Sequence, residues 1–153
     1  MPAPPGPESC LLVIATARQG TASVTGPTYF SYLQLAVKGV DKRIEITSEH
    51  NAYCTDLPAG SHTTETIREQ FVVPPGYEAT IQPRPAVPFV VPFVLRARTI
   101  TVFPVMFVLE INQTGGGVQY GWQPIELTDE RKAEIISGLK KQPGFARWPN
   151  GAM

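Results

Sequence analysis

The residues in this sequence that are best suited to chemistry are two histidines with acidic neighbours. His50 directly follows Glu49, and His62 comes shortly after Asp56, so these side chains could offer nitrogen and oxygen ligands to a zinc ion. Their spacing matches no zinc motif such as His-Glu-x-x-His, in which both histidines share one face of a helix. We therefore predict that both histidines lie in exposed loops and that the chain holds no metal.

Catalytic signatures are equally sparse. Ser48, Glu49 and His50 are consecutive, but a fold assembles a catalytic triad from distant positions, so adjacency carries no weight. The chain has neither the Gly-x-Ser-x-Gly elbow of serine hydrolases nor a glycine-rich nucleotide fingerprint. No predicted helix follows Gly115–Gly117, so these glycines are typical of a hairpin loop and not of a phosphate cradle. We predict no catalytic residues and no cofactor, and therefore a protein that is not an enzyme.

Aromatic residues near the C-terminus could form a binding platform. Tyr120 and Trp122 alternate along one predicted strand, so their rings would share a face and could stack against a sugar or another small ligand. The alternative is that Trp122 anchors the core, which is the commoner role of a tryptophan. Trp148 lies beyond the predicted helix, where it either contacts a partner or pins the tail onto the domain.

The most unusual segment is an apolar run that prolines interrupt, from Pro83 to Pro92. No charged residue occurs between Pro85 and Leu95. One interpretation is an edge strand buried beneath the helix, because sheets tolerate proline at their edges. The other is an apolar surface that a partner covers. In the second interpretation the candidate partner-binding residues are Pro85, Val87, Phe89, Val91, Phe93 and Trp148.

Two cysteines, Cys10 and Cys54, could form one disulfide. Such a bond would close a loop of some forty residues and contribute roughly 3–4 kcal/mol in the chain-entropy model. It would also indicate an oxidising compartment. The alternative is two buried thiols that behave as small apolar groups.

The elements that would position these residues are short strands. The continuous apolar run Cys10–Ala17 predicts a strand buried on both faces. In His62–Val73, Ile67, Phe71 and Val73 point inward, while Thr64 and Thr66 belong to a polar outer face. Alternation or apolar runs predict further strands at 29–38, 42–47, 52–57, 78–82, 89–95, 99–103, 105–111 and 118–122. The pair 29–38 and 42–47 forms a hairpin, and Pro104 joins 99–103 to 105–111 through a bulge.

One helix signal stands near the C-terminus. Thr128 is a good N-cap, and Asp129 and Glu130 place negative charge in the first turn, where it suits the helix dipole. Pro143 and Gly144 end the helix.

Composition supports an all-β fold. The 153 residues include 16 prolines and 13 glycines, which divide a chain into short segments joined by turns. We predict an antiparallel β-sandwich of the immunoglobulin or transthyretin type with one short C-terminal helix. Residues 1–9 would form a proline-rich extended arm, 10–126 the sandwich, and 127–153 the helix and a tail packed on the same domain.

Charge and hydropathy exclude several functions. Positive and negative charges balance at 13 each, whereas a nucleic-acid-binding protein usually carries a basic excess. The apolar stretch Ala86–Leu109 contains Arg96 and Arg98 as well as prolines, so we predict no transmembrane segment. The N-terminal residues lack the basic start and apolar centre of a signal peptide.

The turn Leu57-Pro58-Ala59-Gly60-Ser61-His62 follows an alternating strand pair and Asn51-Ala52-Tyr53. This order resembles bacterial envelope β-sandwich domains of the PEGA and carboxypeptidase-regulatory type, and small lipoproteins built on the same plan. In those families a Leu-Pro-x-Gly-x-His turn leads into the next strand. The segment 93–107, in which a strand is followed by Thr99-Ile100-Thr101-Val102, is similar to their closing strands. The resemblance covers residues 10–111 and implies binding or scaffolding outside the cytoplasm, with no catalytic residues.

Together these observations predict a non-enzymatic structural or protein-interaction domain of a bacterial cell envelope or surface assembly. We expect a protein partner or self-assembly, no nucleic acid, and an extracytoplasmic location. One alternative is a subunit of a larger particle, such as a virion decoration or an appendage. The other is a module that binds a carbohydrate or a small ligand through Tyr120 or Trp122.

Overall fold

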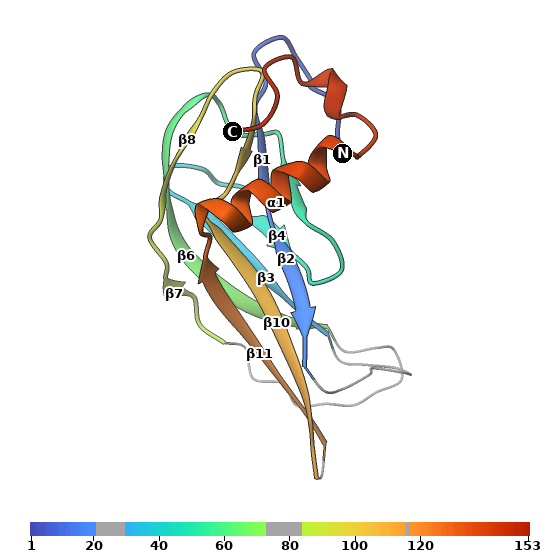
Figure 1. Ribbon diagram of the computed structural model, residues 1–153. Coiled ribbons are helices and arrows are strands. Elements are labelled where there is room, and N and C mark those ends of the chain that lie inside the picture. The colour runs from blue at the N-terminus through green and yellow to red at the C-terminus, as the bar shows by residue number, and fades with distance from the viewer. Residues whose placement is uncertain (21–29, 73–83, 116) are drawn as a thin grey trace.

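The computed structural model describes residues 1–20, 30–72, 84–115 and 117–153, and within them the chain is mostly β-structure. Three small sheets and a C-terminal helix make up the fold (Figure 1).

The first sheet contains β5 (Ala52–Cys54), β1 (Leu11–Ile14) and β9 (Ile100–Val102) in that order. The second contains β11 (Gly117–Glu126), β10 (Val105–Thr114) and β2 (Thr16–Gln19). The third contains β4 (Ile44–Ile46), β3 (Phe30–Val37), β6 (Gly60–Val72) and β7 (Val87–Pro88), and β8 (Pro92–Leu95) also pairs with β6. The predicted strand 78–82 lies outside the described residues.

The prediction of a purely antiparallel fold is wrong, because two pairings are parallel. β1 runs parallel to β9, and β2 runs parallel to β10. Alternation identifies a strand but says nothing about the direction of its partner. One signal did point to the answer, since β1 is buried on both faces as predicted, and continuous apolar runs are typical of parallel strands.

The first and second sheets continue into each other along two nearly unbroken strands. Only Ala15 separates β1 from β2, and Phe103 and Pro104 separate β9 from β10. The register changes by two residues between the two sheets, from Leu11 opposite Ile100 to Thr16 opposite Phe107. Main-chain hydrogen bonds from Phe103 to Val13 and from Phe107 to Ala15 connect the two sheets across this break. The change of register confirms the irregularity predicted at Pro104.

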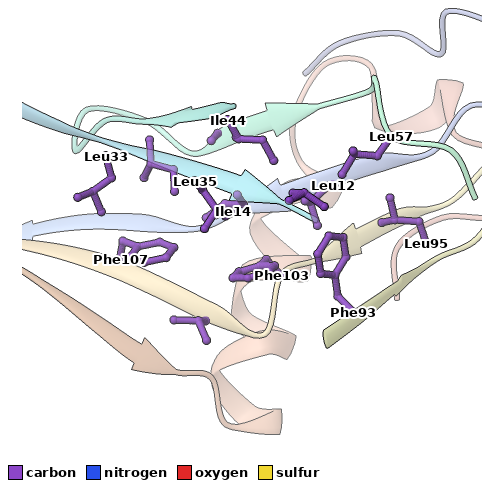
Figure 2. Close-up of a cluster of buried hydrophobic side chains, with 14 of the residues drawn as sticks. Leu12, Ile14, Leu33, Leu35, Ile44, Leu57, Phe93, Leu95, Phe103 and Phe107 are labelled. Carbon is purple, nitrogen blue, oxygen red and sulfur yellow. The ribbon is translucent and has the colours of Figure 1, made fainter. Parts of the chain in front are cut away.

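The third sheet supplies the other wall of the main core. β3 pairs antiparallel with β4, which confirms the predicted hairpin, and with β6 on its other side. Figure 2 shows side chains of β3 and β4 lying against those of the first and second sheets. The cluster includes Leu12, Ile14, Leu33, Leu35, Ile44, Leu57, Phe93, Leu95, Phe103 and Phe107. Burial of this apolar area is the main term that holds the two layers together.

The helix α1 (Asp129–Lys140) covers the opposite face of the first and second sheets (Figure 1). Its predicted N-cap is confirmed, since the Thr128 side chain accepts a hydrogen bond from the Arg131 main-chain N–H at 3.1 Å. Leu139 packs with Leu11 and Val13, so the helix explains why β1 has no exposed face. Within the described residues, no helix is both long and apolar enough to span a bilayer.

The two chain termini meet at one end of the molecule (Figure 1). After the short 3₁₀ helix η1 (Phe145–Arg147), the Trp148 indole N–H donates to the Pro2 carbonyl at 3.0 Å. The last residues then run beside β9, where Ile100 and Ala152 form a parallel bridge. The arm and the tail therefore hold each other in place.

Candidate functional site: an apolar pocket between the sheets

An apolar pocket of about 370 Å³ lies between the second and third sheets. β3 and β6 form one wall, β10 and β11 form the other, and segment 84–89 closes one side. Its volume falls in the range of small-molecule sites. The lining residues are Leu33, Ile67, Glu69, Arg84, Pro85, Val87, Pro88, Phe89, Phe107, Trp122 and Pro124.

The pocket brings together two sets of residues that the sequence analysis treated separately. Pro85, Val87 and Phe89 belong to the predicted partner surface, and Trp122 to the predicted ligand platform. The Trp122 ring packs against the main core, and its indole N–H donates to the buried Ser31 hydroxyl at 2.8 Å. That bond satisfies the polar end of the indole, so the ring can serve as an apolar wall.

The Thr64 hydroxyl adds two hydrogen bonds to those that hold the segment closing the pocket. Thr64 in β6 is fully buried, and its hydroxyl donates to the Phe89 carbonyl at 2.6 Å and accepts from the Val91 N–H at 2.8 Å. The assignment of Thr64 to the polar outer face is wrong. A bulge in the β3–β6 pairing places Ala36 opposite Thr66 and Val37 opposite Thr64. The register shifts by one residue at this bulge, and the shift turns the Thr64 side chain inward.

An ion pair stands among the otherwise apolar lining. The Arg84 guanidinium donates to the Glu69 carboxylate at 2.9 Å, and it also lies 5.5 Å from the centre of the Phe71 ring. The Glu69 side chain is 12% exposed and that of Arg84 is 61% exposed. The pair is therefore shielded on the carboxylate side and open to solvent on the arginine side, and it adds little to stability.

The prolines of the pocket occupy positions that only an edge strand tolerates. The Phe89 N–H and the Val91 carbonyl bond to β6, so the alternate positions, Pro88 and Pro92, direct their nitrogens away from it. In β11 the Leu127 N–H bonds to the Pro104 carbonyl beside β10, and alternation then directs the Pro124 nitrogen away from β10 as well. Each proline thus removes an N–H group from a free edge and from no described ladder.

The remaining predicted partner residues lie elsewhere. Val91 and Phe93 point into the main core, which agrees with the edge-strand interpretation of this run, although the helix covers other strands. Trp148 is 2% exposed and packs between the helix and the first sheet, so it offers almost no surface to a partner. Tyr120 stands opposite Ile111 in β11, and its side chain lies outside the described part of the chain.

Both cysteines are free thiols in the structure. Cys10 is buried and Cys54 is half-buried, and both contact the main core from neighbouring chain segments. Burial raises the pKa of Cys54 above its ordinary value, and burial followed by the charge of Glu8 raises the pKa of Cys10. Cys54 also lines a second hollow, of about 380 Å³, near the exposed ion pair of Lys42 and Asp56.

The prediction of an exposed loop is wrong for His62, which lies in β6, is half-buried and packs on Phe93. His62 donates through Nε2 to the Pro58 carbonyl at 2.7 Å and stacks on Phe93, while Gly60 takes a positive φ of 132°. This geometry gives Gly60 and His62 of the Leu57–His62 turn a physical role. His50 is exposed. Across residues 1–20, 30–72, 84–115 and 117–153, no three metal-ligating side chains come together.

Sequence reasoning missed seven lining residues as members of one site: Leu33, Ile67, Glu69, Arg84, Pro88, Phe107 and Pro124. The apolar members were recognisable as inward-facing strand residues, but nothing in the alternation says that two layers leave a gap between them. The available signal was Arg84, which stands at the start of the charge-free run. Comparisons with protein-family models, with curated proteins and with solved structures find no match to this chain.

Proposed function

We propose that this chain is a non-enzymatic binding domain whose pocket between the second and third sheets holds the apolar part of a small ligand. The observation that carries the proposal is the shared lining, in which Phe89, Phe107 and Trp122 from three separate segments face one pocket of about 370 Å³. Ligand sites of this kind combine aromatic walls with a few polar groups. The ion pair of Glu69 and Arg84 supplies those groups.

The edge prolines favour a small ligand over an added peptide strand. Binding by strand addition needs a continuous row of free N–H and C=O groups along a sheet edge. Pro88 and Pro92 interrupt that row on one edge beside the pocket, and Pro124 interrupts it on the other. A compact apolar molecule needs no such row, because contact with the rings is sufficient.

We also propose that the two layers form a β-sandwich that acts outside the cytoplasm as part of a bacterial envelope. The support is the resemblance of the Leu57–His62 turn to the turn of envelope domains. In this structure the turn buries Leu57 and carries the chain directly into β6. Fractionation of the native cell would test the location, and recovery in the cytosolic fraction would count against it.

The test of ligand binding uses Trp122 as its own reporter. Trp148→Phe leaves Trp122 as the remaining tryptophan, and the probe is the apolar dye 8-anilinonaphthalene-1-sulfonate. We expect saturable quenching of Trp122 fluorescence. Val87→Glu should weaken binding about tenfold or more, because it places a charge on the pocket wall. Val90→Glu is the matched control, since Val90 belongs to the same segment, is 68% exposed and does not line the pocket.

Equal loss of dye binding in Val87→Glu and Val90→Glu would contradict the proposal, because dye binding would then depend on surface charge and not on the pocket. Unsaturable binding that Val87→Glu leaves unchanged would contradict it as well.

A second candidate function is protein interaction through the outer side of segment 87–94. Val90 and Val94 are 68% and 53% exposed, and neither lines the apolar pocket. Exposed apolar patches often mark interaction sites. Sedimentation of the purified chain over a range of concentrations would detect self-association, and Val90→Glu with Val94→Glu should abolish it.

A further inference from the structure

A smaller pocket, of about 200 Å³, lies where the N-terminal arm meets the C-terminal tail. Its lining residues are Pro4, Gly6, Pro7, Arg98, Arg147 and Pro149. Two of these six residues carry a positive charge and none carries a negative charge. The pocket is separate from the apolar pocket, with which it shares no lining residue.

Backbone hydrogen bonds hold both arginines in place. The Arg98 N–H donates to the Ser9 carbonyl at 2.8 Å, and the Arg98 carbonyl accepts from the Asn150 N–H at 3.1 Å. The Arg147 N–H donates to the Gly144 carbonyl at 3.0 Å within η1, and the indole of the neighbouring Trp148 is bonded to the Pro2 carbonyl. The arm, the turn before β9 and the tail therefore form one framework around the pocket.

The backbone of Arg98 has an uncommon conformation. Its φ is 65°, and it is the only described non-glycine residue with a positive φ. This region is unfavourable for an arginine, and such conformations are concentrated at functional sites. Asn150 also donates through its side chain to the Ala97 carbonyl at 3.1 Å, so the turn that holds Arg98 is bonded to the tail on two sides.

Neither guanidinium has a protein partner within the described residues. The ion pairs there are Lys42–Asp56, Arg84–Glu69 and Arg131–Glu134, and no side-chain hydrogen bond involves the guanidinium of Arg98 or Arg147. Both arginines line the pocket and both are exposed to solvent, so each guanidinium is available to an anion that enters it.

We propose that Arg98 and Arg147 form a binding site for an oxyanion, which is either a free phosphate or sulfate ion or the carboxylate of a larger molecule. The planar guanidinium offers paired N–H donors whose spacing matches the oxygens of these groups. The proline walls give the site a fixed shape, so little chain entropy is lost on binding. An anion here would link the arm to the tail and stabilise that junction.

The experiment is calorimetric titration of the purified chain with sodium phosphate, sodium sulfate and sodium acetate, each against sodium chloride at equal ionic strength. We expect saturable binding of at least one oxyanion and a concentration-dependent rise in the melting temperature. Binding of phosphate or sulfate would identify a free ion as the ligand, and binding of acetate alone would identify a carboxylate.

Arg147→Gln and Arg98→Gln should each weaken binding about tenfold or more, which is the loss expected for one charged hydrogen-bond donor group. Arg147 is exposed, so its substitution should leave the fold intact. Arg96→Gln is the matched control, because Arg96 is exposed on the same turn but does not line the pocket. Val87→Glu should bind the oxyanion normally, which separates this site from the proposed ligand pocket.

Two results would overturn the proposal. One is an equal stabilisation by sodium chloride at matched ionic strength, which would show general screening of charge. The other is oxyanion binding that persists in both Arg98→Gln and Arg147→Gln.

Discussion

Replacing Thr64 with valine should loosen the wall of the apolar pocket while leaving the side-chain volume almost unchanged. The Thr64 hydroxyl makes two hydrogen bonds with segment 89–91, at 2.6 Å and 2.8 Å. Valine has the same branched shape but no hydroxyl, so the Phe89 carbonyl and the Val91 N–H lose their partner. Segment 84–91 then keeps fewer bonds to β6, and the pocket should lose its fixed shape.

The loss of stability follows from the two hydrogen bonds and from the burial of the Phe89 carbonyl and the Val91 N–H. A typical hydrogen bond contributes about 1 kcal/mol net, and a buried group left without a partner costs roughly 1–3 kcal/mol. Phe89 and Val91 are half-buried, so water can partly replace the hydroxyl, and the lower end of that range applies. We therefore expect Thr64→Val to lower the free energy of unfolding by about 2 kcal/mol.

Urea unfolding followed by circular dichroism would measure this loss. With a slope of about 2 kcal/mol per molar urea, the midpoint should fall by roughly 1 M. Thr63→Val is the matched control, because its hydroxyl makes no hydrogen bond with the described residues, and it should stay within about 0.5 kcal/mol of the parent. Equal midpoints for the two variants would refute the claim that the Thr64 hydroxyl holds the pocket wall.

Three further predictions concern other parts of the fold. Trp148→Ala should cost about 3–5 kcal/mol in thermal unfolding, because it empties the largest buried site beneath the helix, whereas Trp148→Phe should cost less. The pKa of Cys54 is raised in the folded state, so its contribution to stability should be fully present below the ordinary thiol pKa of about 8.5 and fall at higher pH, where the unfolded chain loses the proton first. Cys54→Ala should weaken that fall in urea titrations at several pH values. Gly20→Ala should lower the free energy of unfolding by about 3 kcal/mol or more, because the added Cβ would overlap the Ile111 carbonyl. Gly39→Ala should lower it by about 1–2 kcal/mol, because its added Cβ meets no atom and only the positive φ is unfavourable.

The strands and the helix were predictable because each depends on a local pattern. Alternation marks which side chains of β3 and β4 face the core, and Thr128 begins the helix wherever it packs. Alternation predicts the inward and outward side chains of β6 correctly from Thr66 to its C-terminal end. On the N-terminal side of Thr66 a bulge shifts the pattern by one residue. A bulge depends on the partner strand, which the sequence of β6 does not contain.

The pocket was not predictable, although several of its residues were singled out. Whether Trp122 fills the core or lines a cavity depends on how far β11 stands from β6, and spacing between layers is a property of all the side chains between them. The element that covers the second face of β1 was hidden for a related reason. The apolar run of β1 predicts burial on both faces, but the helix that covers one of them begins over a hundred residues later.

The prolines of segment 85–92 connect the fold to the proposed function. In the sequence they look like interruptions, yet Pro88 and Pro92 fall at positions whose nitrogens point away from β6, so they cost the sheet no hydrogen bond. Their effect is on the outside, where a neighbouring strand finds fewer donors to pair with. Pro124 acts in the same way on β11. Because Pro88 and Pro124 also line the apolar pocket, the same residues that discourage an added strand form part of its wall.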